Sequence, residues 1–494
     1  MKMRRTATML AAVLVLAGSA RAQHRDAVPV FAGPLLGPVA TEHHVSLGGR
    51  TIPYRAVFRE YPLNSKAGQP VATISATAYI RSDANDARRP VLFLFNGGPG
   101  ASSSPLHFSA FGPRLKPPGR SIDGPFVDNP DSLLDIADLV FIDPPGTGFS
   151  RLLEAGEGAK LFAPVADAAA VTQLIRDWLK GNGRTTSPIF IGGESYGGFR
   201  LATMMRHAAD LNVKGLLLIS PATSLESQAG AETGDNFYVF RLPTMAVAAW
   251  YHGLVDRKGR SAEQVYDDAA AFAERDYLVA LHQGSALPAA EKRRIAERMA
   301  GFIGLPVQTI LDGDLRINED YFVENLLKDK HLLLGRLDTR VTAPAVVRTD
   351  RPAALNDPSL GLGASNVIRS PAITRYMADE LNVRPGRDYV SLSIDVNFSW
   401  NWSELTDNRI LYFNPLPNIA SAMASNPAVR LMVVGGLYDL VVPIAGPRYA
   451  VRHAKIPLDR VRFLAVPAGH SAFEPPETRA KFTAPIRDFI RAAG

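Results

Sequence analysis

The chain has 494 residues, enough for one large domain with an insertion or for two or three separate domains. Apolar residues make up 46% and charged residues 21%, which is ordinary for a soluble globular protein. The net charge of +6 comes without a dense run of Lys and Arg, so we expect no nucleic-acid partner. The chain has no cysteine, which excludes disulfides, a thiol nucleophile and a thiolate metal site.

Residues 1–22 have the pattern of a secretory signal peptide. Basic residues at Lys2, Arg4 and Arg5 precede the apolar run at 7–18, and small residues follow at 20–22. The apolar run is too short to span a bilayer comfortably, so we expect no stable membrane span in the mature chain. The pattern predicts an exported protein, periplasmic or secreted, whose mature chain begins near residue 23.

The first half of the mature chain alternates strand and helix patterns. Gly48 and Gly49 separate two runs of strand character, which predicts a hairpin. Residues 164–181 carry apolar side chains on one helical face. Strands that alternate with helices indicate an α/β fold with a parallel sheet. The other predicted strands lie at 71–80, 90–95, 138–143, 188–193 and 215–220.

The pattern becomes mainly helical at residues 226–410. Ser261 and Gln264 form a capping box, and Pro288 stands near the start of a further helix. The later predicted elements are helices at 318–330 and 370–381 and strands at 431–436 and 461–466. The sequence therefore favours one α/β core, residues 23–225 and 411–494, interrupted by a mainly helical cap at 226–410. Two tandem domains are the alternative.

The stretch "IGGESYGGFR" (191–200) follows a predicted strand directly. A strand that leads into Gly-x-Ser-x-Gly predicts a nucleophile elbow, in which the serine hydroxyl is exposed on a tight strand-to-helix turn. Gly193 and Gly197 flank Ser195 because side chains there would collide with the neighbouring backbone. An ordinary glycine-rich loop is the alternative interpretation of this pattern taken alone.

A serine hydroxyl needs a base within hydrogen-bond reach to act as a nucleophile. In α/β-hydrolases the acid and the histidine follow the serine in the chain, on loops after the last strands. Asp439 comes just after the strand at 431–436, and His470 just after the strand at 461–466. We therefore predict a Ser195–Asp439–His470 triad in an α/β-hydrolase fold with a mainly helical cap insertion. The backbone N–H of Tyr196 and one from the glycine-rich loop at 95–104 would stabilise the oxyanion.

Five segments resemble the serine carboxypeptidase family, peptidase family S10, in a bacterial form. The segments are "NGGPGASSS", "FIDPPGTGFS", "GGESYGG", "GGLYDLVVP" and "PAGHSAFEPPE", in the family's order. The resemblance implies release of C-terminal residues from peptides with a free C-terminus, without a cofactor or metal. It also implies that Gly98 and Tyr196 form the oxyanion hole and that Asn96 and Glu194 bind the substrate's terminal carboxylate.

Three positions depart from the family's usual pattern. Ala101 replaces a cysteine, Ala110 replaces a glutamate that often partners the residue before the serine, and Leu94 replaces a tryptophan. These departures leave two alternatives open. One is an esterase or acyltransferase on the same scaffold, and the other is a non-catalytic binding protein that kept the fold. Oligomeric state and the preferred C-terminal side chain are not predicted.

Overall fold

The computed structural model describes the chain from residue 28 to residue 493 with short gaps. The described ranges are 28–84, 87–116, 125–223, 234–345, 353–363, 365–405, 414–474 and 476–493. The predicted signal peptide at 1–22 lies outside them. No helix in these ranges is both long enough and apolar enough to cross a lipid bilayer.

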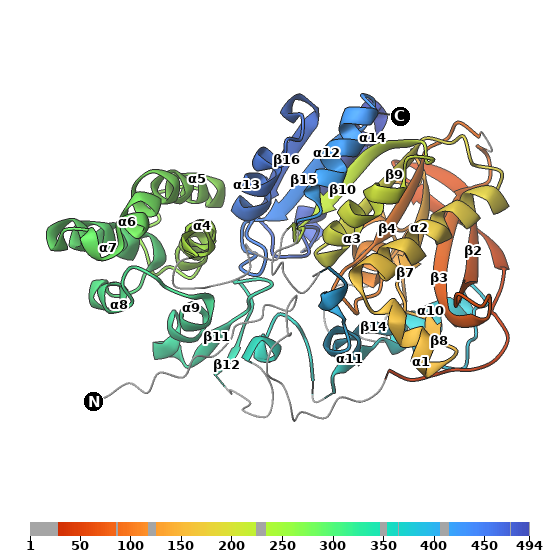
Figure 1. Cartoon of the computed structure of the whole chain (residues 1–494), viewed down its shortest axis with the longest axis horizontal. Coiled ribbons are helices and arrows are strands. Elements are labelled where there is room, and N and C mark those ends of the chain that lie inside the picture. The colour runs from red at the N-terminus through yellow and green to blue at the C-terminus, as the bar shows by residue number, and fades with distance from the viewer. Residues whose placement is uncertain are drawn as a thin grey trace.

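One ten-stranded sheet runs through the molecule (Figure 1). Its strands are ordered β1-β2-β3-β7-β4-β9-β10-β15-β16, and β8 pairs with β3 at the side. The first three are antiparallel: β1 Val39–Leu47, β2 Arg50–Asn64 and β3 Pro70–Arg81. The remaining six are parallel to one another: β4 Val91–Phe95, β7 Asp138–Asp143, β9 Ile189–Glu194, β10 Val213–Ile219, β15 Arg430–Gly436 and β16 Val461–Val466.

The predicted strands and the hairpin at Gly48-Gly49 are confirmed, with boundaries that shift by two residues or fewer for the parallel strands. The central parallel strands are mostly apolar because helices cover both faces of the sheet. Along β4, Phe93 belongs to one apolar cluster, while Leu92 and Leu94 belong to the cluster on the other face. This alternation follows from the two-residue period of a strand.

Helices form a layer on each face. α2 Pro164–Gly181, α3 Tyr196–Met204 and α12 Leu416–Ser425 contribute to the cluster that contains Phe93. α10 Pro371–Asp379 and α14 Pro476–Ala493 contribute to the other cluster, together with the π-helical turn at Leu106–Phe111. The smaller elements of the core are α1 Ala155–Gly158, α13 Ala445–His453, β5 Arg114–Leu115, β6 Val127–Asp128 and β8 Arg151–Leu152.

The residues after β10 form a group of helices to one side of the sheet (green in Figure 1). Ser261 and Gln264 make the expected reciprocal capping bonds at the start of one of these helices. A small antiparallel pair, β11 Leu332–Leu334 and β12 Thr342–Pro344, follows them. The helices are α4 Asp235–Tyr251, α5 Ala262–Phe272, α6 Leu278–Gln283, α7 Ala289–Ile303, α8 Val307–Asp312 and α9 Glu319–Asn325.

The end of the predicted cap segment returns to the core. β13 Val367–Arg369 pairs with β14 Val390–Ser393, and α11 Ile394–Phe398 follows. Isolated bridges join Leu392 to Ala101 and Val390 to Gly148, so this part lies against loops of the sheet. The division into core and cap at residues 226 and 410 stays a prediction.

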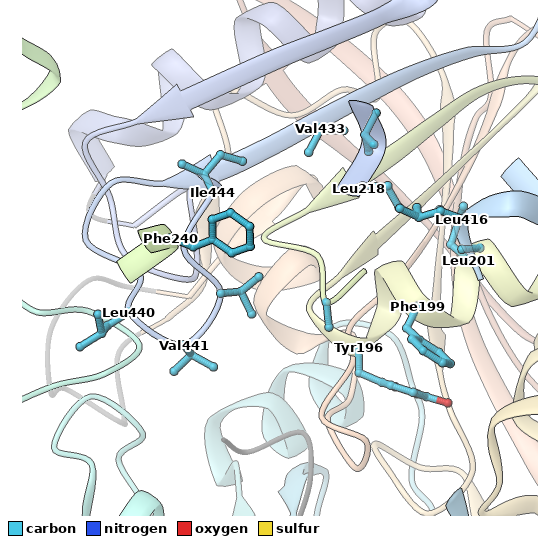
Figure 2. Packing of buried hydrophobic residues seen from close by; sticks show 14 of the residues in the cluster. Tyr196, Phe199, Leu201, Leu218, Phe240, Leu416, Val433, Leu440, Val441 and Ile444 are labelled. Carbon is cyan, nitrogen blue, oxygen red and sulfur yellow. The ribbon is translucent and has the colours of Figure 1, made fainter. Parts of the chain in front are cut away.

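The first helix of the insertion packs directly on the core. Figure 2 shows Phe240 of α4 beside Ile444, the residue that precedes α13. Phe240, Leu440, Val441 and Ile444 belong to the same apolar cluster as the helices over the sheet. The insertion and the core therefore share one continuous hydrophobic core, which gives the loops between them fixed positions.

Candidate active site

Ser195 is the turn residue between β9 and α3. Its backbone has φ 60° and ψ −127°, a conformation that an L-residue adopts only when its surroundings enforce it. From Ile189 to Arg200, Ser195 is the only residue that is not buried. The turn therefore gives this serine, and none of its neighbours, access to solvent.

The flanking glycines are required by close backbone contacts. A Cβ on Gly193 would stand 2.2 Å from the carbonyl oxygen of Gly197, and a Cβ on Gly197 would stand 3.0 Å from that of Phe95. The first distance is shorter than real Cβ contacts allow, and the second is at the tight end of their range. Larger residues at these positions would force the turn apart, which explains the Gly-x-Ser-x-Gly pattern.

Asp439 and His470 are hydrogen-bonded to each other. His470 Nδ1 donates to Asp439 Oδ2 at 2.7 Å, and the aspartate is completely buried. The other oxygen, Oδ1, accepts from the backbone N–H groups of Val441 at 3.0 Å and Val442 at 2.9 Å. These bonds fix the carboxylate, so it orients the imidazole and leaves Nε2 free to accept a proton.

The electrostatic surroundings favour the protonated form of His470. Burial alone would lower the pKa of His470, but the Asp439 carboxylate, with smaller effects from Glu194 and Asp357, raises it above the usual value. A raised pKa makes the imidazole a stronger base toward a hydroxyl proton. The pair therefore has the electrostatic character of a general base held by a carboxylate.

Backbone and hydroxyl contacts bring the elbow and the histidine loop to the same edge of the sheet. Ser195 N donates to Ile219 O at 2.9 Å, at the end of β10. The next residue, Ser220, donates from its hydroxyl to His470 O at 2.6 Å. Ser471 Oγ donates to Glu194 Oε1 at 3.4 Å. Among the hydrogen bonds of the described residues, none joins the Ser195 hydroxyl directly to the His470 ring, a contact that often tightens only when substrate binds.

The glycine-rich loop after β4 lies against the elbow. A Cβ on Gly97 would stand 2.4 Å from the backbone nitrogen of Tyr196. Gly98 has φ +95°, and a Cβ there would stand 2.6 Å from Gly100 N. Only glycine fits this conformation and this spacing. The loop thus brings its own backbone beside the N–H that follows Ser195.

Asn96, at the start of this loop, and Glu194, at the end of β9, lie next to each other. Each residue is 3% exposed. Burial raises the pKa of Glu194 to about 7, with a further increase from Glu474, while His470, Asn96 and Ser471 oppose the shift. Asn96 Oδ1 accepts from Leu106 N at 3.5 Å, which directs its NH₂ group away from that nitrogen. Glu194 is therefore partly neutral near pH 7 and can donate a hydrogen bond.

Ala110 and Leu94, two positions that differ from the family pattern, are fully buried in the apolar cluster on one face of the sheet. Neither offers a polar group to Glu194. The structure therefore places no carboxyl at position 110, where the resemblance would have led us to expect a partner for Glu194.

The sequence analysis missed a buried ion pair beneath the elbow. Arg200 Nε donates to Asp167 Oδ2 at 2.6 Å, and both side chains are completely buried. Arg200 Nη1 also donates to the carbonyl oxygen of Asn96 at 2.6 Å, and Tyr196 OH donates to the same aspartate at 3.3 Å. The pair therefore links α2, the elbow helix and the glycine loop. An arginine within a short, otherwise apolar helix was the signal that could have revealed it.

Aromatic side chains surround Tyr196. Trp400 and Trp402 pack edge-on against its ring at centroid distances of 5.3 and 5.8 Å. Phe199 stacks beside it, as Figure 2 shows. The tryptophan-rich stretch at 395–404 therefore packs the last part of the insertion against α3, the helix that follows Ser195.

His107 has a structural role. It is buried and hydrogen-bonded to Tyr79 OH at 2.7 Å, and burial lowers the pKa of its imidazole well below the usual value.

Replacing Gly97 by Ala should displace the loop from Tyr196 N, because the new methyl group has no space. We expect a loss of about 1–3 kcal/mol in the free energy of unfolding. The rate at which a fluorophosphonate phosphonylates the Ser195 hydroxyl, with loss of fluoride, should fall by about a hundredfold, since small misplacements of reacting groups are costly. The control is Gly301→Ala in α7, where nothing lies within 4 Å of the new Cβ, so stability should rise slightly. Equal behaviour of the two variants would contradict the geometry.

Known proteins of similar sequence are described as serine carboxypeptidase-like proteins or as a carboxypeptidase Y homolog. The chain is 27% identical over 188 residues to serine carboxypeptidase-like 36 of Arabidopsis thaliana, a match that covers 36% of this chain and 37% of the relative. It is 31% identical over 155 residues to the carboxypeptidase Y homolog of Arthroderma benhamiae, covering 29% of each. The chain thus aligns with about a third of these relatives' lengths, and they come from a plant and a fungus. The bacterial form of the family stays a prediction.

Solved structures that align with most of this chain have low sequence identity to it. An aryl esterase from Burkholderia cenocepacia aligns over 88% of this chain and 99% of its own, with 13% identity and a TM-score of 0.36. The peroxisomal α/β-hydrolase Lpx1 of Saccharomyces cerevisiae aligns over 89% and 90%, with 10% identity and a TM-score of 0.38. The six parallel strands with helices over both faces form an α/β-hydrolase fold, as predicted. The sequence profile of the serine carboxypeptidase family matches residues 78–330, more than half of the 494, and the chain belongs to that family.

Proposed function

We propose that the protein is a serine-type carboxypeptidase that releases C-terminal residues from peptides through a Ser195–His470–Asp439 triad. The observation that carries this proposal is the 2.7 Å bond between the His470 imidazole and the buried Asp439 carboxylate, at the sheet edge that also holds the Ser195 turn. Membership of the family supports the same reaction class.

In this proposal Ser195 attacks the carbonyl carbon of the last peptide bond, and His470 takes the hydroxyl proton. The C–N bond then breaks, and His470 gives the proton to the leaving amine. Water next attacks the acyl-enzyme by the same route and frees the shortened peptide. The backbone N–H groups of Gly98 and Tyr196 would hold the oxyanion, and each such donor typically contributes about 3 kcal/mol.

The terminal carboxylate of the substrate would bind at Asn96 and Glu194. A neutral Glu194 can donate to a carboxylate, whereas an ionised one would repel it. The buried position of Glu194, which raises its pKa to about 7, supports this role. The apolar surroundings of Ala110 favour the second candidate, an esterase or acyltransferase, because one carboxyl of the usual pair is missing there. A non-catalytic binding protein would not need the bonded Asp439–His470 pair.

A fluorophosphonate probe tests the enzyme directly. We expect the wild-type protein to be labelled at Ser195, and labelling to be lost in Ser195→Ala. It should fall by roughly 10⁴-fold in Asp439→Asn, because that amide cannot hold the reactive tautomer. A wild-type chain that resists the probe would favour the binding protein.

A comparison of substrates then separates the two enzyme classes. It uses matched peptides with free and with amidated C-termini, together with an ester. Hydrolysis of the ester, with no preference for the peptide that has a free carboxylate, would favour the esterase.

The pH dependence of KM tests Glu194. Below about pH 7 the neutral carboxyl donates to the substrate, and as the pH rises through its pKa of about 7 the ionised form repels the substrate. KM for a free-carboxylate peptide should therefore rise above pH 7, while KM for an ester should stay flat. In Glu194→Gln the amide donates at every pH, so the peptide's KM should lose its dependence. An unchanged KM profile in the variant would rule out the proposed contact.

We infer from the sequence pattern at 1–22 that the protein is exported. N-terminal sequencing of the protein from the periplasm or the medium of an expressing bacterium should show a chain that begins near Gln23. Recovery of the full-length chain in the cytoplasm alone would argue against export.

A further inference from the structure

A short segment of the insertion, Gly335–Val341, runs between the loops that carry Asp439 and His470; we call it the strap. Its backbone bonds to both neighbours of Asp439. Leu440 N donates to Arg336 O at 2.9 Å, and Thr339 N donates to Tyr438 O at 3.1 Å. The strap therefore holds the acid loop on either side of the catalytic aspartate.

The strap also holds the histidine loop. His470 N donates to Leu337 O at 2.6 Å. A Cβ on Gly469 would stand 2.6 Å from the same carbonyl oxygen, so only glycine allows this approach. Arg340 Nη1 donates to Pro467 O at 3.1 Å. Consecutive carbonyls of the strap, at residues 336 and 337, thus bond one to the acid loop and the other to the histidine itself.

One carboxylate fixes these two strap residues. Asp357 Oδ1 accepts from Arg336 N at 3.1 Å, and Oδ2 accepts from Leu337 N at 3.2 Å. Ser359 N donates to Oδ1 at 2.8 Å, and the Ser359 hydroxyl donates to it as well. Asp357 is 7% exposed and accepts every one of these bonds, the pattern of an ionised carboxylate.

We propose that Asp357 is a positioning residue for the Asp439–His470 pair, acting through the strap. Its two oxygens fix the N–H groups of the residues whose carbonyls hold the two loops, so the separation of Asp439 and His470 is set partly by a third carboxylate. The inference rests on the proposed function, because it concerns the base of that triad. It adds a contribution from the insertion to a site otherwise built from loops of the sheet.

The charge of Asp357 gives this role a signature that packing alone would not have. Burial alone would lower the pKa of His470, and Asp357 is one of three carboxylates that raise it, with Asp439 and Glu194. Burial raises the pKa of Asp357 itself, while its hydrogen bonds and Arg336 oppose that shift. Among the described residues, the other charged groups near the two loops and Asp357 include Asp338, which is paired with Arg340 on the strap, Glu474 beyond the histidine, Arg336, which is paired with Asp320, and Glu324, which lines a cavity together with Asp357.

The test measures fluorophosphonate labelling of Ser195 in the full-length protein from about pH 5 to about pH 9, where labelling follows deprotonation of the histidine. Asp357→Asn and Asp357→Ala both remove the charge, but only Asn keeps an oxygen acceptor. In both variants the half-maximal pH should fall by roughly 0.3–1 because His470 loses a negative neighbour. The plateau rate should fall about tenfold in the Ala variant and less in the Asn variant, since loop placement then suffers to different degrees.

Two further variants separate positioning from mere stability. Ile310→Ala removes a fully buried side chain of α8 and should lower the melting temperature without moving the half-maximal pH or the plateau. Ser359→Ala removes the hydroxyl that donates to Asp357 and also accepts from Leu337 N at 3.1 Å, without a change of charge, so the plateau should fall slightly at an unchanged half-maximal pH. If folded Asp357→Asn behaves like Ile310→Ala, the inference is wrong and the triad stands. If the wild-type chain is not labelled at any pH, the proposed function itself fails.

Discussion

The backbone contact between the glycine loop after β4 and the turn at Ser195 is the constraint on which the site depends. With Gly97 against Tyr196 N, the end of β4 and the start of α3 are closer than any side chain would permit. This contact gives Ser195 its unusual φ and ψ, exposes that one residue, and sets two backbones beside the position of a reacting carbonyl. The buried Arg200–Asp167 pair supports the contact from below by holding the Asn96 carbonyl.

Much of the fold could be predicted because its signals are local. Apolar runs bounded by turn residues gave the strands, and Gly-x-Ser-x-Gly after such a run gave the turn at Ser195. Asp439 and His470 could also be named from the sequence, because their order in the chain and their positions just after two strands were enough to select them. The structure shows that the two side chains are hydrogen-bonded. The Arg200–Asp167 pair, the Ser220 hydroxyl and the strap could not be predicted. Each depends on contacts between residues far apart in the chain, and neither a charged residue nor a short loop shows its partner in the sequence.

Two titrating groups stand close together at the site, and their preferences conflict. In the proposed reaction, binding of the substrate carboxylate requires neutral Glu194, while proton abstraction requires neutral His470. Burial raises the pKa of Glu194 to about 7, and the carboxylates around His470 raise its pKa as well. An ionised Glu194 stabilises a protonated imidazole, so the two groups titrate as a coupled pair. The fully neutral form is therefore confined to a limited pH range, and the Asp357 charge helps to set where that range lies.

The hydrogen bonds of the strap also restrict how far the helical insertion can move relative to the loops of the sheet. Many hydrolases admit substrate when a covering domain swings about a hinge. Here such a swing would pull Leu337 away from the backbone of His470 and Arg336 away from Leu440. An open conformation would therefore no longer hold Asp439 and His470 in their bonded arrangement. In the proposed reaction, entry of the peptide and departure of the freed amino acid must then use a passage that leaves residues 335–341 in place, because any motion that dislodges them would disrupt the proposed catalytic pair.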